Sequence, residues 1–141
     1  LQQRILILDG AMGTMLQQLN PTIEDWGGPA FENCPENLLY TRPHWIRDIH
    51  RQYYQAGADI VETDSFGGHT ITLAEFGLLD KIHEVNATAA RLAREAAAEF
   101  EADGRPRFVA GSMGPTTRAI TVTGGTTFDE LRHGYYLQAK G

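Results

Sequence analysis

The feature that most constrains the fold is a unit that occurs three times, a short apolar run followed at once by a turn containing glycine. The apolar runs are residues 5–8, 59–63 and 108–110, and the turns are residues 9–14, 64–68 and 111–116. Apolar runs of this length are typical of strands buried on both faces. Helical patterns separate the three units, so we expect an α/β fold with a functional site at the carboxyl ends of the strands.

The bulk properties exclude several classes of protein. The 141 residues carry a formal net charge of -6 without a basic cluster, which argues against nucleic acid as the main partner. No apolar run approaches the roughly 18 residues that a membrane-spanning helix needs. The single cysteine excludes an internal disulfide. We therefore expect a cytoplasmic protein with neither a nucleic-acid nor a membrane partner.

Four segments are predicted to be helical. The first covers residues 12–19, and the second follows Thr41, which we expect to be its N-cap, with Pro43 in the first turn and Gly57 as the stop. Apolar residues spaced three and four apart predict a long helix over residues 79–102. The sequence from Thr127 to Glu130 has the form of a capping box and predicts a helix start.

Residues 20–36 contain several glycines and prolines, and we expect an irregular loop there at the mouth of the site. Three parallel strands cannot close a barrel, and the last strand would leave an unpaired edge. The preferred interpretation is that residues 1–141 form the N-terminal part of a larger domain. The alternative is an open three-stranded α/β layer.

The three turns together resemble the homocysteine S-methyltransferase family. The matching blocks are residues 8–14, with the sequence LDGAMGT, residues 56–66, and residues 109–116. Their order and separation fit the family over nearly the whole chain. Within the family, the DGAMGT turn is most similar to the N-terminal homocysteine-binding module of the cobalamin-dependent branch.

The resemblance implies an α/β fold that is the N-terminal portion of a (β/α)8 TIM barrel, with about three βα units and the barrel incomplete. It implies methyl transfer from methylcobalamin to the homocysteine thiol, forming methionine. The cofactors would be zinc, held by three cysteines on later strands, and cobalamin, bound by another module. Partners would include that module and a methyltetrahydrofolate-binding module. This chain would hold no metal ligand or catalytic residue and would be inactive alone.

Two alternative functions remain open at this point. The first is a homocysteine methyltransferase that uses betaine or S-methylmethionine as the donor. The second is a non-catalytic fragment that only binds small anions.

The first turn is the main candidate for substrate binding. Gly10 and Gly13 would let backbone N–H groups converge into a nest for an anion. By the resemblance, this anion is the homocysteine carboxylate, and Asp9 faces the ammonium group. In the alternative interpretation Asp9 only caps the backbone that follows. The full set of candidates in this turn is Asp9, Gly10, Ala11, Met12, Gly13 and Thr14.

Further substrate-binding candidates follow the second and third strands. Glu62, Thr63 and Asp64 end the second run, and strand alternation lets only some of them face inward. Relatives often carry Asn at the position of Asp64, which could hold the substrate amine or a neighbouring loop. Ser112 could donate a hydrogen bond, whereas its neighbours Gly111, Gly114 and Pro115 shape the turn.

The remaining polar and aromatic candidates are better explained without a site. Cys34 has no second cysteine near it and is interpreted as a free loop thiol. Four of the histidines, His44, His50, His83 and His133, fall on predicted helices and are expected on solvated faces, while His69 follows a strand end and is the one to watch. Trp26 and Phe31 are expected to pack rather than to cover the mouth of the site.

Overall fold

Three short backbone segments lie parallel to one another. In the computed structural model, which describes residues 5–141, β1 (Ile60–Glu62) pairs with β2 (Phe108–Ala110), and Val61 lies opposite Val109. On the other side of β1, Leu8 forms a single parallel bridge with Ile60. The segments therefore lie side by side in chain order, as expected for consecutive βα units.

The first expected strand, residues 5–8, is reduced to that one bridge. The backbone N–H groups of Asp59 and Ile60 both donate to the carbonyl of Ile7, at 2.8 and 3.1 Å, and the Ile7 N–H donates to the Asp59 carboxylate. The Asp59 carboxylate thus takes the place of a backbone carbonyl as the acceptor for Ile7 N–H, so the strand pairing does not extend toward Ile5. The third strand is confirmed over residues 108–110.

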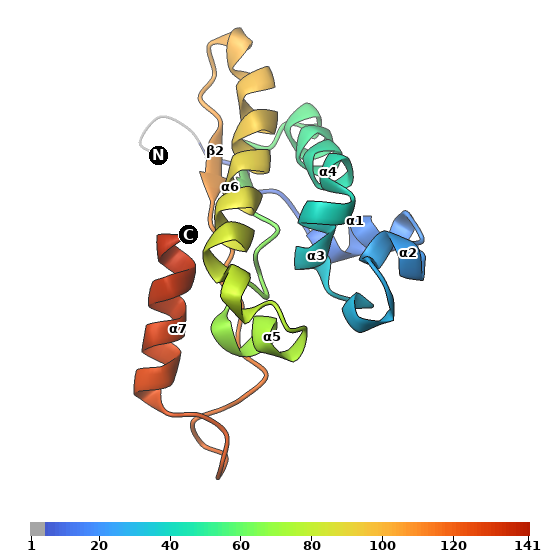
Figure 1. Ribbon diagram of the computed structural model, residues 1–141. Coiled ribbons are helices and arrows are strands. Elements are labelled where there is room, and N and C mark those ends of the chain that lie inside the picture. Colours follow the sequence, from blue (N-terminus) through green and yellow to red (C-terminus); the bar gives the residue numbers. More distant parts are fainter. Residues whose placement is uncertain (1–4) are drawn as a thin grey trace.

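The described part of the chain contains seven α-helices, of which α4 and α6 pack against the strands (Figure 1). They are α1 (Met12–Gln18), α2 (Ile23–Trp26), α3 (Pro35–Thr41), α4 (Pro43–Ala56), α5 (Thr70–Glu75), α6 (Ile82–Glu99) and α7 (Phe128–Lys140). Short 3-10 turns cover η1 (Pro29–Phe31), η2 (Leu79–Lys81) and η3 (Glu101–Asp103). Helix α6 packs against both α4 and α7, and Figure 1 shows α6 in the middle of the molecule.

The longer helices follow the sequence patterns closely. Helix α4 has Pro43 in its first turn and ends at Gly57, whose φ of 109° is left-handed. Helix α7 begins with the predicted capping box, in which Thr127 and Glu130 each bind the other's backbone N–H. Thr41 is not the N-cap of α4, because it is the last residue of α3, and Arg42 stands between the two helices.

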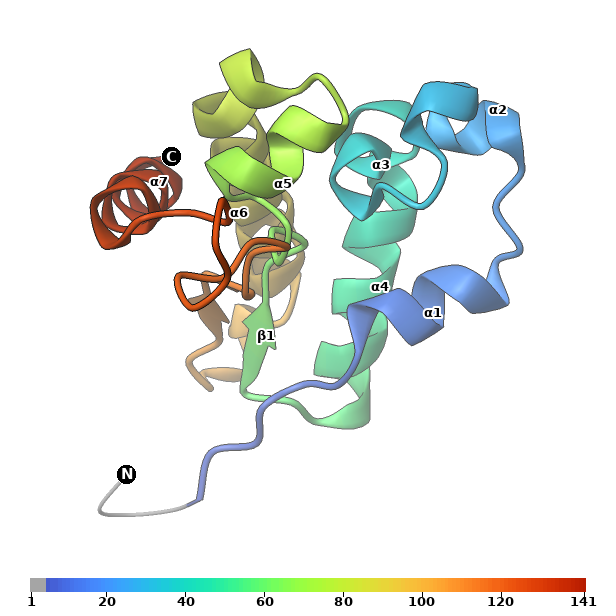
Figure 2. The ribbon, with the colours of Figure 1, turned by 90° about the horizontal axis from the view of Figure 1, so that it is seen from below.

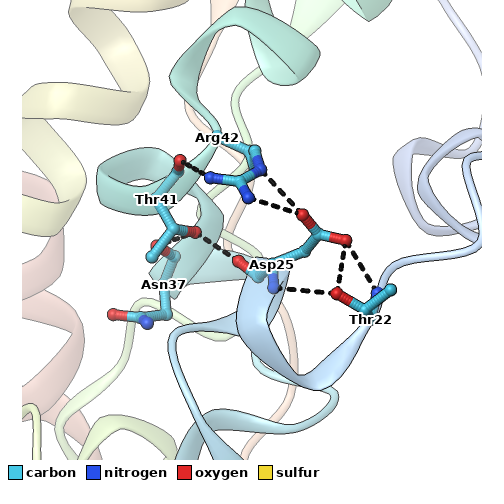
Figure 3. Close-up of polar contacts among 5 residues, drawn as sticks. All are labelled: Thr22, Asp25, Asn37, Thr41 and Arg42. Carbon is cyan, nitrogen blue, oxygen red and sulfur yellow. Dashed lines mark hydrogen bonds and ion pairs between the residues drawn. The ribbon is translucent and has the colours of Figure 1, made fainter.

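The prediction that residues 20–36 are irregular throughout is wrong, because α2, η1 and the start of α3 lie within this range. Helix α2 starts in a second capping box, in which Asp25 N donates to Thr22 Oγ1 and Thr22 N donates to Asp25 Oδ2. Figure 3 shows how Arg42 then contacts the same carboxylate, with Nε 2.8 Å from Asp25 Oδ1. The Thr41 hydroxyl donates to the Asp25 carbonyl at 2.6 Å. Polar contacts from α3 and Arg42 therefore order a segment that lacks a long apolar pattern.

Two apolar clusters stabilise this arrangement. The larger joins α3, α4 and α6 through fully buried side chains such as Leu38, Ile46 and Val85. The smaller packs alanines of α6 against Tyr54 and Val61, behind the sheet. Burial of these faces holds the sheet against α4 and α6. Figure 2 shows β1 with its carboxyl end directed toward the connecting loops.

Candidate functional site

A pocket of about 530 Å³ lies at the carboxyl ends of the parallel segments. It is formed by the turn before α1, the end of β1 with the turn after it, the start of α3, and the turn after β2. All the predicted site residues line it except Thr14, which is exposed on α1. The lining set is Asp9, Gly10, Ala11, Met12, Gly13, Asn33, Pro35, Glu36, Glu62, Thr63, Asp64, Phe66, Gly67, Thr72, Phe76 and Ser112.

A second pocket of the same volume lies elsewhere, beside α5, α6 and α7, and contains none of the predicted residues. Its lining combines apolar side chains with Arg118, Glu130 and His133. The strand-end pocket is the candidate site because acidic groups and a helix start converge in it, whereas the second pocket lies away from the sheet.

Asp9 binds the backbone of β1 and does not cap α1. Its Oδ2 accepts a hydrogen bond from Glu62 N at 3.0 Å, while the N-cap of α1 is Ala11, without a side-chain cap. Burial, with a smaller contribution from the charge of Glu62, raises the pKa of Asp9 to about 6, although the hydrogen bond from Glu62 N acts in the opposite direction. Asp9 is thus predominantly ionised at pH 7, in a partly buried position where a cationic partner would stabilise it.

The two glycines of the first turn do not have the left-handed backbone that a nest requires. Gly13 is a helical residue of α1, and neither Gly10 nor Gly13 has a positive φ. A Cβ at Gly10 would lie 3.0 Å from the Tyr53 hydroxyl oxygen, so close packing explains this glycine. The N–H donors in this part of the pocket belong instead to the first turn of α1, where a helix has no acceptor of its own.

The ends of β1 and β2 are joined by a buried hydroxyl network. Thr63 Oγ1 accepts from Ser112 N at 2.9 Å and lies 2.6 Å from Ser65 Oγ, which donates to the Ser112 carbonyl. Gln138 of α7 donates to the Ser65 carbonyl at 2.8 Å. The Thr63 side chain is therefore committed to holding the strand ends together. Ser65 and Gln138 were missed, because no local pattern connects residues so far apart.

Glu62 and Ser112 face the pocket more openly. Ser112 Oγ lies 3.4 Å from Glu62 Oε2, to which it donates, and Glu62 is exposed. The carboxylate of Glu62 thus remains accessible to a ligand at the mouth of the pocket.

Glu36 is the main pocket residue that the sequence did not reveal. It is 4% exposed at the start of α3, and its Oε1 accepts from Gly67 N at 2.6 Å. Burial raises its pKa. Asp64 is equally buried, and burial followed by the charge of Glu36 raises its pKa well above the ordinary value. The only sequence signal for Glu36 was its place in the first turn after Pro35, in a segment interpreted as loop.

Cys34 is a free cysteine, as expected, but it is fully buried at the N-cap of α3 rather than in an open loop. Burial, assisted by the charge of Glu36, raises its pKa to about 12. A thiol with so high a pKa stays protonated at neutral pH, whereas zinc binds the thiolate. Residues 5–141 contain no group of three or more His, Cys, Asp or Glu side chains placed to hold a metal ion, so these residues do not fit a zinc site.

The histidines and aromatic residues are mostly structural. His50 was expected on a solvated face but is fully buried, whereas His44, His83 and His133 are exposed as expected. His69 Nδ1 accepts from Ile71 N at 3.1 Å and so caps α5. Trp26 is a member of the larger core cluster, and Phe31 packs against it. No helix among the described residues has the length and apolar character to cross a bilayer.

Together the fold and site define an α/β domain with an acidic ligand pocket at the ends of parallel strands. The family model for homocysteine S-methyltransferase matches residues 6–141, so the chain belongs to the homocysteine S-methyltransferase family. This finding confirms the family predicted from the three turns.

The chain is similar to two curated methionine synthases. It is 40% identical over all 141 residues to those of Mycobacterium tuberculosis and Mycobacterium leprae, and it spans only 12% and 11% of their lengths.

Among solved structures, the chain resembles the Escherichia coli homocysteine methyltransferase MmuM. The metallated form is 28% identical with a TM-score of 0.66, covering 81% of this chain and 39% of MmuM. The oxidized form is 30% identical with a TM-score of 0.67 over the same shares. The likeness therefore concerns less than half of MmuM.

Proposed function

We propose that this chain supplies the amino-acid-binding part of an enzyme that methylates the thiol of homocysteine and forms methionine. The observation that carries the proposal is the strand-end pocket, which brings the carboxylate of Asp9 together with the start of α1, where the first N–H groups of a helix have no intrahelical acceptor. No Lys or Arg of the described residues lines it. An amino-acid zwitterion fits this pairing, with its ammonium group at Asp9 and its carboxylate at the helix start.

In this proposal the chain is the N-terminal portion of a (β/α)8 barrel. The parallel order of Leu8, β1 and β2 supports it, because consecutive strands of such a barrel are neighbours. Zinc, when bound by the complete enzyme, would supply activation of the homocysteine thiol. Residues 5–141 hold and orient the amino-acid end of the substrate and contain no metal-binding cluster of their own.

The proposed methyl donor is methylcobalamin, bound by a separate module, with a methyltetrahydrofolate-binding module as a further partner. The higher identity to the mycobacterial methionine synthases, 40% against 28–30% for MmuM, supports this branch of the family. A betaine- or S-methylmethionine-dependent enzyme is the alternative. Assays of the intact gene product with each donor in turn distinguish them, since only one donor should support methionine formation. We propose a cytoplasmic location for the enzyme.

Replacing Asp9 by Asn tests the binding role. We expect Asp9→Asn in the intact gene product to weaken homocysteine binding by roughly ten- to over a hundredfold, because a charge-assisted hydrogen bond of about 1.5–3 kcal/mol is lost. Isothermal titration with homocysteine measures the change.

The melting temperature of the same variant is the control. Burial raises the pKa of Asp9 to about 6, so above that pH the folded state carries a disfavoured charge. Asp9→Asn should therefore melt at the same temperature as the unsubstituted protein or higher at pH 7. A lower melting temperature with unchanged affinity would show that Asp9 only supports the β1 backbone.

A further inference from the structure

Asp64 is a buried carboxyl group with one oxygen that has no partner among the described residues. It follows β1, lines the strand-end pocket and is only 4% exposed. Its Oδ2 is shielded from solvent and has no hydrogen-bond partner among the described residues. An ionised carboxylate in this position would be strongly destabilised, because neither water nor a donor compensates for its charge.

The neighbouring groups favour the neutral form of Asp64. Glu36, 4% exposed, accepts the Gly67 N–H and so has a donor that stabilises its own charge. The Cys34 thiol beside it stays neutral, because burial raises its pKa to about 12. When two buried carboxyl groups interact, ionisation of one disfavours ionisation of the other. The Gly67 donor therefore favours the charge on Glu36, and the unpartnered Oδ2 favours the proton on Asp64.

We infer that Asp64 is a protonated carboxylic acid that donates a hydrogen bond to the carboxylate of the bound amino acid. The inference rests on the proposed function, which places an amino-acid zwitterion in this pocket. It gives the two acids of the pocket opposite roles. Asp9, partly buried and predominantly ionised, attracts the ammonium group, whereas neutral Asp64 supplies an O–H donor for the carboxylate. When the environments of two carboxyl groups in one site give them different pKa values, the two groups commonly have different roles.

The same substitution at both acids separates these roles. In the intact gene product, Asp64→Asn keeps a neutral side chain with a donor and should bind homocysteine within about threefold of the unsubstituted protein, whereas Asp9→Asn should lose at least about tenfold. Asp64→Ala removes a donor to a charged carboxylate and should lose roughly ten- to over a hundredfold. Melting curves of each variant confirm that the pocket is folded.

Infrared spectroscopy tests the charge state directly. The C=O band of a protonated carboxyl group should be present in the ligand-free protein, shift when homocysteine binds, and be absent from Asp64→Asn. This signature distinguishes a proton on Asp64 from a purely structural contribution of the residue.

Three results would overturn the inference. A tenfold or greater loss in Asp64→Asn, with its melting temperature unchanged, means that the carboxylate acts in its ionised form. Unchanged affinity in Asp64→Ala means that Asp64 does not contact the ligand. Failure of the unsubstituted protein to bind homocysteine overturns the proposed function and the inference together, whereas loss in Asp64→Asn alone overturns only the inference.

Discussion

Single residues in this chain take charge states that their local sequence does not indicate, and His50 is an instance. It lies fully buried on α4, and neither ring nitrogen has a hydrogen-bond partner among the described residues. Burial lowers its pKa to about 4, so the imidazole is neutral in the folded protein. Its sequence position suggested a solvated helix face, because the stripe that defined the helix did not include it.

This burial predicts a specific sensitivity to acid. The unfolded chain protonates His50 near its ordinary pKa of about 6.5, so stability falls as the pH falls from there toward about 4 and is unaffected above that window. Between pH 7 and pH 5 the unsubstituted protein should lose about 2 kcal/mol more unfolding free energy than His50→Gln. Urea denaturation at both values measures this. The exposed His44→Gln on the same helix is the control, and an equal loss in both variants would contradict the prediction.

At the scale of elements, the length of a helix and the period of its apolar residues determine whether the sequence predicts that helix. Helix α6 has 18 residues and a repeated buried stripe, including Val85, Ala89 and Leu92, so its period is readable from the sequence. Helices α2 and α5 have only 4 and 6 residues, too few to show a period. These two short helices are stabilised by their caps and by contacts with residues distant in the sequence.

The cap of α2 can be tested alone. Thr22→Ala removes the hydroxyl that accepts from Asp25 N, and we expect a loss of about 1 kcal/mol in unfolding free energy. Thr22→Ser keeps the oxygen and should restore most of it. Chemical denaturation gives the energies, and limited proteolysis between residues 20 and 33 reports local opening. Equal stability of the three proteins would mean that the Asp25–Arg42 contact alone orders the segment.

For the whole molecule, the sheet is the weakest part of the packing. Within the described residues, β2 pairs only with β1, and Phe108 is 44% exposed. On the opposite side, Ile7 and Leu8 are 57% and 49% exposed. Unpaired strand edges beside exposed apolar side chains favour association with other chains.

We therefore expect the isolated chain of residues 1–141 to self-associate or to melt at low temperature without cooperativity. Sedimentation velocity over a range of concentrations and a thermal melt followed by circular dichroism check this. A monomer that melts in one sharp transition would show instead that α4, α6 and α7 stabilise the open sheet without further strands.

The sequence by itself determined the parts that depend on local chemistry. Apolar runs before small-residue turns gave the positions of β1, β2 and the Leu8 bridge, and these placed Asp9, Glu62, Asp64 and Ser112 at one end of the sheet. Parallel strands bring their carboxyl ends together, so this grouping follows from the order of elements alone.

Only the tertiary structure decided which of these groups carry charge and which residues join them. Glu36 enters the pocket because α3 packs against α4 and α6. Its hydrogen-bond partner Gly67 is 31 residues away in the sequence. Burial, unpaired oxygens and the proximity of two carboxyl groups depend on how the elements pack, and each of them alters the free energy of ionisation. The sequence could therefore locate the pocket, whereas packing alone sets the charge states of Asp64 and Glu36.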